Sequence, residues 1–245
     1  MFKQIPNLFT LLNLLFGCIA IAHILSPDTI GGNSLTVGMI TGSIYIFLAA
    51  VVDFLDGFVA RLFKATSGMG AQLDSLADAV TFGVAPGMII YKFLQIGFAS
   101  AGQIHPSFWL LLPAFIIPCA AVWRLAKFNL DAEQRYYFKG VPTPAAGLTV
   151  ASLPLIAYQQ STIDVLLYNP YALYSFALLI SILMVCNLPI ISLKFKNRSL
   201  NANIDKIVLA VIAILSAVFL RWLAVPVVFI LYIIVSIILR PNKSL

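Results

Sequence analysis

Four carboxylates are grouped in a chain that is otherwise poor in charge. Asp53, Asp56, Asp74 and Asp78 fall within 26 positions and account for four of the nine acidic residues in the 245-residue sequence. The residues around them are largely apolar, and a carboxylate close to hydrocarbon is costly unless it is paired, hydrated or bound to a metal. The grouping therefore predicts a cation site and argues against a solvated acidic loop.

The spacing of these carboxylates predicts that they converge. Asp53 and Asp56 are three residues apart and share one helix face, and Asp74 and Asp78, four residues apart, share a face of the next helix. Two facing helices would bring four oxygen ligands to one point. Oxygen ligands are those that hard divalent cations such as Mg²⁺ require.

The same face of the first helix carries groups suited to a phosphate ligand. Gly57, Ala60 and Arg61 continue the i, i+4, i+7, i+8 pattern that begins at Asp53. Glycine and alanine add little bulk, so a ligand can approach the backbone closely. The guanidinium of arginine presents a planar set of donors that matches phosphate oxygens.

This stretch resembles the signature of the CDP-alcohol phosphotransferase family, D-x2-D-G-x2-A-R-x8-G-x3-D-x3-D. All its fixed positions are filled, by Asp53, Asp56, Gly57, Ala60, Arg61, Gly70, Asp74 and Asp78. The resemblance implies a membrane enzyme in which a CDP-linked lipid, CDP-diacylglycerol, donates a phosphatidyl group to an alcohol and releases CMP.

The resemblance also implies roles for individual residues. Two ions, Mg²⁺ or Mn²⁺, would be held by Asp53, Asp56 and Asp74, with Asp53 and Asp74 bridging, and by Asp78, which is also the candidate general base. The CDP-diacylglycerol contacts would be Gly57 and Arg61, with Ser67, Asn7 and Thr10 as weaker candidates. Asn7 also fits an ordinary helix N-cap, and the two roles are compatible.

A second segment indicates which alcohol accepts the phosphatidyl group. The stretches Arg124-Leu-Ala-Lys-Phe-Asn129 and Phe138-Lys-Gly-Val-Pro-Thr-Pro-Ala-Ala-Gly147 resemble the bacterial and archaeal phosphatidylserine synthases within that family. L-serine would then be the acceptor, and Arg124, Lys127 and Asn129 are the candidates for binding it. On residue type alone, a basic loop at the cytoplasmic face explains this segment equally well.

Composition predicts an all-α integral membrane protein. Hydrophobic residues make up 61% of the chain and charged residues 10%. Most of the apolar runs approach the roughly 20 residues that a bilayer requires. We expect about eight transmembrane helices, six core helices plus a short C-terminal pair, with six spans and a shallow pair as the alternative; the runs are about 8–25, 36–62, 72–97, 108–126, 143–160, 170–193, 206–220 and 222–239.

The positive charges predict the orientation. With both termini in the cytoplasm, thirteen of the fifteen Lys and Arg residues lie in inner loops, and only Lys92 and Arg221 do not. This places the Asp cluster at the cytoplasmic face of the inner membrane. The net charge of +6 then reflects orientation and contact with anionic membrane lipids, and nothing indicates a nucleic-acid partner.

We divide the chain into a catalytic membrane domain at 1–200 and a C-terminal helical hairpin at 201–245. The resemblance also implies a homodimer, because homodimers are usual in the family.

Two other functions remain open from the sequence. Another member of the family, using glycerol-3-phosphate or an inositol phosphate as acceptor, would also suit the basic segment. An ion-coupled transporter would also place carboxylates in a membrane, but it would tend to place them near the midplane.

Overall fold

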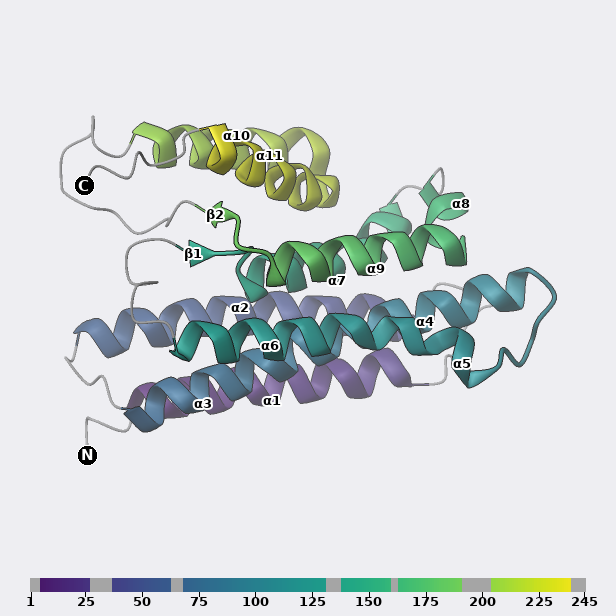
Figure 1. The fold of residues 1–245 in the computed structure, drawn as a ribbon, viewed down its shortest axis with the longest axis horizontal. Helices are drawn as coiled ribbons and strands as arrows, with labels where there is room; N and C mark the ends of the chain where they lie inside the picture. The colour runs from purple at the N-terminus through teal and green to yellow at the C-terminus, as the bar shows by residue number, and fades with distance from the viewer. Residues whose placement is uncertain are drawn as a thin grey trace.

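Long helices running along a common axis make up the molecule (Figure 1). The computed structural model describes residues 5–26, 37–62, 68–130, 138–159, 163–190 and 204–238. In chain order the elements are α1 (Ile5–Leu25), α2 (Val37–Leu62), α3 (Gly68–Asp78), a π-helical segment (Ala79–Val84), α4 (Ala85–Ser100), α5 (Phe108–Leu111), a 3₁₀ turn (Leu112–Phe115), α6 (Ile116–Leu130), β1 (Phe138–Lys139), α7 (Thr143–Gln159), α8 (Asp164–Leu167), α9 (Pro170–Val185), β2 (Pro189–Ile190), α10 (Ile204–Leu220), a second 3₁₀ turn (Arg221–Leu223) and α11 (Ala224–Ile238).

Among the residues that the structure describes, five helical stretches are long and apolar enough to cross a bilayer, which confirms an all-α membrane protein. They are Pro6–Leu25, Val37–Val59, Gly68–Ser100, Phe108–Leu130 and Val211–Ile238, and α9 is a shorter apolar helix. The last stretch reverses direction where Arg221 takes a left-handed backbone conformation (φ 51°). The helices on either side of this turn, α10 and α11, contact each other and lie side by side (Figure 1).

The π-helical segment that follows Asp78 lies at the centre of the bundle. It contacts α1, α6 and α7, and Thr81, Phe82 and Gly83 within it are buried. Two glycines allow this close approach. A Cβ at Gly17 of α1 would collide with Thr81, and a Cβ at Gly147 of α7 would lie 2.8 Å from the backbone oxygen of Phe82.

A short antiparallel pairing fixes the start of α7. Phe138 and Lys139 of β1 pair with Ile190 and Pro189 of β2. Just beyond the strand, the Gly140 amide donates to the Leu188 carbonyl at 2.8 Å. The pairing ties the segment before α7 to the segment after α9.

The prediction for the sixth apolar run was wrong about where its helix ends. It was expected to continue to residue 193, but α9 ends at Val185 and is followed by Cys186 in an extended conformation (ψ 159°). Pro189 lacks the amide hydrogen that a continuing helix would need, so the chain forms the β2 pairing instead.

The tight packing around the π-helical segment predicts a stability difference between two glycine substitutions. Gly147→Ala should lower the apparent melting temperature of the purified protein, because overpacking against a rigid backbone costs about 1–3 kcal/mol. Gly57→Ala should not lower it, because no atom lies within 4 Å of the added Cβ. Equal melting temperatures for the two variants, measured by differential scanning fluorimetry in detergent, would contradict this packing.

Candidate active site

Three of the predicted carboxylates meet at one point. Asp53 and Asp56 come from α2 and Asp74 comes from α3, and each offers a ligand oxygen within 4.8 Å of those of the other two. Asp56 is buried, and the other two are partly buried. A compact set of anionic oxygens fits a hard divalent cation such as Mg²⁺ or Mn²⁺.

Asp78 adjoins this group but does not belong to its compact set. The Asp78 carboxyl interacts with those of Asp53 and Asp74, and Asp78 is 8% exposed. The side-chain amide of Asn13 donates to Oδ1 of Asp78 at 3.4 Å. One oxygen of this carboxylate is thereby held by the protein.

Helix α1 supplies two polar side chains to the carboxylates. The Thr10 hydroxyl lies 2.8 Å from Oδ2 of Asp56 and 3.2 Å from the backbone oxygen of Pro6. Asn13, one turn later, reaches Asp78 and is fully buried. Because residues three apart share a helix face, α1 presents a polar stripe to a site built by α2 and α3.

The predicted donor-substrate residues are only partly described. Gly57 lies beside Asp56 with open space where a Cβ would be. Asn7 lies in α1 one turn before Thr10 and is partly buried. Arg61 lies in the last turn of α2, but its side chain is outside the described part of the structure, and Ser67 is outside it altogether.

Of the three residues predicted to bind the serine substrate, Arg124 is the one that lies at the site. It is 7% exposed, it donates to the Thr143 hydroxyl at 3.0 Å, and its guanidinium carbon lies 5.7 Å from the centre of the Phe128 ring. It interacts electrostatically with Asp78 and Tyr232. Its Nε has no hydrogen-bond partner among the described residues. A buried guanidinium that has an unsatisfied donor and lies beside a carboxylate can bind a further anion.

The other two residues predicted to bind serine, Lys127 and Asn129, have protein partners. Lys127 donates to the side-chain oxygen of Asn187 at 2.5 Å. Asn129 donates to the Ser75 hydroxyl at 2.9 Å, and this contact links α6 to α3 next to Asp74. Both contacts are made to residues outside the carboxylate cluster, and they support the shape of the site.

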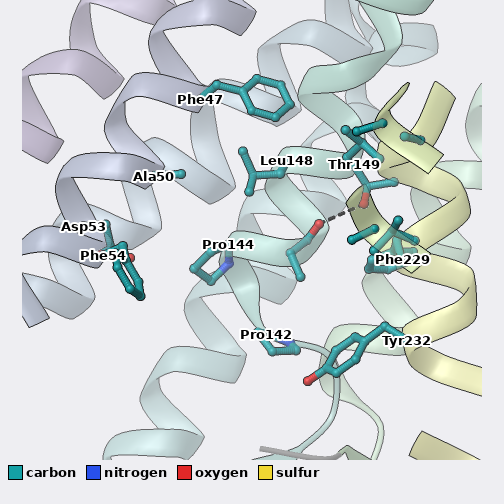
Figure 2. Close-up of a pocket in the computed structure, with 16 residues that line it drawn as sticks. Phe47, Ala50, Asp53, Phe54, Pro142, Pro144, Leu148, Thr149, Phe229 and Tyr232 are labelled. Atoms are coloured by element: carbon teal, nitrogen blue, oxygen red, sulfur yellow. Dashed lines mark hydrogen bonds between the residues drawn. The ribbon is translucent and has the colours of Figure 1, made fainter. Parts of the chain in front are cut away.

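A large apolar cavity opens beside the cluster. Its volume is about 820 Å³, and Asp53 is one of its lining residues. Figure 2 shows Phe47, Ala50 and Asp53 of α2 along one side and Phe229 and Tyr232 of α11 opposite, with Leu148 of α7 between them.

Sequence reasoning missed Asn13, Thr143 and Tyr232 as parts of the site. A signal existed for two of them. Asn13 is a polar residue within an apolar helix, three positions after Thr10, and Tyr232 interrupts an almost entirely aliphatic helix. Polar side chains in membrane helices usually face the protein interior. No pattern in the sequence pairs Thr143 with Arg124, because that contact depends on how α6 and α7 pack.

The sequence profile of one family, CDP-alcohol phosphatidyltransferase, matches residues 3–190 and so includes every residue of the carboxylate cluster. The chain belongs to this family. A Helicobacter pylori (strain 26695) relative named CDP-diacylglycerol–serine O-phosphatidyltransferase is 31% identical over 254 aligned residues, covering 98% of this chain and 96% of the relative.

Other relatives of the same name match a smaller part of the chain. The Bacillus subtilis relative is 32% identical over 151 residues, which cover 62% of this chain and 75% of the relative. The Saccharomyces cerevisiae relative is 40% identical over 109 residues, covering 41% of this chain and 36% of the relative.

The hydrogen bond from α1 to the cluster predicts an effect on metal affinity. Thr10→Val should weaken Mn²⁺ binding about tenfold, because groups that orient a ligand typically contribute 10- to 100-fold to metal affinity. Free Mn²⁺ measured by electron paramagnetic resonance would report this. Thr149→Val is the matched control, since its hydroxyl donates only to the Ala145 carbonyl of its own helix. Equal Mn²⁺ affinities for the two variants would remove Thr10 from the metal site.

Proposed function

We propose that this chain transfers the phosphatidyl group of CDP-diacylglycerol to L-serine, giving phosphatidylserine and CMP. The observation that carries the proposal is the convergence of Asp53, Asp56 and Asp74 beside a buried pair, Asp78 and Arg124. Relatives named for this reaction match the chain over nearly its whole length.

The carboxylates would hold two divalent ions, Mg²⁺ or Mn²⁺. Such ions, when bound, stabilise the negative charge that develops on a pyrophosphate as one half leaves. Asp53, Asp56 and Asp74 bind metal in this proposal, with Asp78 completing the set. The open space at Gly57 admits the CDP group next to Asp56. Arg61, Ser67, Asn7 and Thr10 are further proposed contacts of that group.

Asp78 is the proposed general base. The serine hydroxyl gives its proton to this carboxylate as its oxygen forms a bond to the phosphatidyl phosphorus, and the bond from that phosphorus to the CMP oxygen breaks. The Asn13 amide holds Oδ1 of Asp78, which leaves Oδ2 for the incoming hydroxyl.

Arg124 is the proposed partner of the serine carboxylate. It is buried beside Asp78 and keeps a spare donor at Nε, whereas Lys127 and Asn129 already contact Asn187 and Ser75. An acceptor bearing both a hydroxyl and a carboxylate would place the hydroxyl near Asp78 while the carboxylate meets Arg124.

Arg124→Ala should therefore raise the KM for serine on the order of 10- to 100-fold, the effect of losing a charged hydrogen-bonding pair. The KM for CDP-diacylglycerol should change far less. Lys127→Ala is the comparison, with a smaller change in the KM for serine. Equal effects of Arg124→Ala on both substrates, in steady-state kinetics, would remove this role.

We further propose eight membrane crossings with both termini and the active site at the cytoplasmic face of the inner membrane. Successive long helices alternate in direction, and the start of α1 and the end of α11 lie toward the same end of the bundle (Figure 1). Asp53 and Asp56 belong to the last turns of α2, which ends toward that end of the bundle (Figure 1). Most of the Lys and Arg residues fall in loops that the sequence predicts to be cytoplasmic.

Cysteine labelling in intact cells tests this topology. In a background where Cys18, Cys119 and Cys186 are replaced by Ser, a Gln103→Cys variant should react with an impermeant maleimide, and a Lys64→Cys variant should react only after lysis. The reverse pattern would invert the orientation.

A homodimer, usual in the family, is part of the same proposal. A mass of two chains in a small detergent micelle, measured by light scattering, would support it, and a mass of one chain would count against it.

The proposed reaction is tested by CMP release from CDP-diacylglycerol, with L-serine, glycerol-3-phosphate and inositol phosphate compared side by side in Mg²⁺ or Mn²⁺. We expect release with serine and its loss in Asp78→Asn. Release only with another acceptor would overturn serine as the substrate. No release with any acceptor would contradict the proposed reaction and favour the ion-coupled transporter.

A further inference from the structure

The C-terminal hairpin, α10 and α11, lies beyond the part of the chain that matches the family profile, which ends at residue 190. Nevertheless it contacts that part, because α11 packs against α7 and β2. It also supplies about half of the lining of the 820 Å³ cavity, through Ala213, Ala217, Ala224, Val225, Val228, Phe229 and Tyr232. The opposite walls come from α2 and α7 within the matched part.

The composition of α11 indicates which of its faces has a function. Among its fifteen residues, only Tyr232 and Ser236 have polar side chains, and both are buried. They are four residues apart and therefore share a face. Tyr232 interacts with Arg124 and lines the cavity together with Asp53, so this face of the hairpin is turned toward the reaction centre.

Small side chains of α10 leave the cavity open. Ala213 and Ala217, also four residues apart, line it, whereas the neighbouring Ile214 and Val218 are 65% and 70% exposed on another face. The Trp222 ring, just before α11, packs against that of Phe47 on the α2 wall, with ring centres 5.4 Å apart. The result is an apolar space that begins at a carboxylate cluster and is walled by aliphatic and aromatic groups.

The chemistry of this cavity selects its occupant. Serine and the cytidine and phosphate groups of the donor are polar and would lose hydration without gaining hydrogen bonds against such walls. An acyl chain gains free energy by burial there. An amphiphile fits, with its anionic head at the carboxylates, where metal ions would bind, and its chain along α2 and the hairpin.

We infer that the hairpin α10–α11 forms one wall of the binding site for an acyl chain of the lipid donor, with Ala213 and Ala217 keeping that site open. This inference rests on the proposed function, because it takes CDP-diacylglycerol as the donor. It gives the C-terminal hairpin a direct part in donor selection.

A bulky residue on this wall tests the inference. Ala217→Phe should lower kcat/KM about tenfold or more for dioleoyl CDP-diacylglycerol, roughly the effect of displacing two methylene groups. It should have little effect with a dihexanoyl donor, whose chains are short, and the KM for serine should not change. Val218→Phe, on the exposed face of the same helix, is the matched control and should behave as the unmodified protein with both donors.

Thermal stabilisation by the donor separates this inference from the reaction itself. Dioleoyl CDP-diacylglycerol with Mn²⁺ should raise the melting temperature of the unmodified protein and of Val218→Phe more than that of Ala217→Phe, while CMP with Mn²⁺ should act alike on all three. Should Ala217→Phe fail to fold, Ala213→Leu makes a smaller change on the same wall and takes its place.

Two outcomes have separate meanings. If the variants at positions 213 and 217 respond to both donors as Val218→Phe does, the hairpin does not form a wall of the acyl-chain site, and the proposed reaction stands. If the unmodified protein releases no CMP with any acceptor but its stabilisation by the dioleoyl donor is lost in Ala217→Phe, the wall stands and the proposed reaction fails.

Discussion

Mutual repulsion among closely spaced, buried and partly buried carboxylates is the constraint around which this protein is built. Three of them bring oxygens within 4.8 Å of one another, and a fourth lies beside them. At effective dielectric constants typical of proteins, like charges at such distances repel by several kcal/mol. The arrangement is stable in an ionised form only with compensating positive charge. Bound divalent ions supply most of that charge in our account, and Arg124 supplies part of it beside Asp78.

The rest of the fold holds these groups in place against that repulsion. Thr10 and Asn13 fix two of the carboxylates from α1, and Gly17 and Gly147 let α1 and α7 close on the π-helical segment that follows Asp78. Short π-helical stretches are frequent at functional sites. Here the segment joins the helix that carries Asp74 and Asp78 to a rigid buried core, so the position of the proposed base depends on packing deep in the bundle.

Much of the site could be predicted from the sequence because it is encoded locally. The spacing of Asp53 and Asp56, and the later Asp74, predicted a cluster that the structure brings together. The helical membrane fold followed from composition. Contacts between distant segments were not predictable in the same way: Asn13 reaches Asp78 across 65 positions, and Tyr232 approaches Arg124 from a helix outside the recognised motif. The separation of Asp78 from the compact group, and the early end of α9, likewise depend on tertiary packing. The roles of individual residues, the boundary near residue 200 and the contribution of Ser67 stay predictions.

The central claim is that these carboxylates bind a pair of divalent ions where the donor pyrophosphate reacts. The most direct test is a crystal structure of the protein with Mn²⁺ and CDP-diacylglycerol, with anomalous scattering used to locate the metal. We predict two manganese peaks, each within bonding distance of oxygens from Asp53, Asp56, Asp74 or Asp78, and both near the donor phosphates. Ordered donor with no manganese at these residues, or manganese bound elsewhere, would contradict the account.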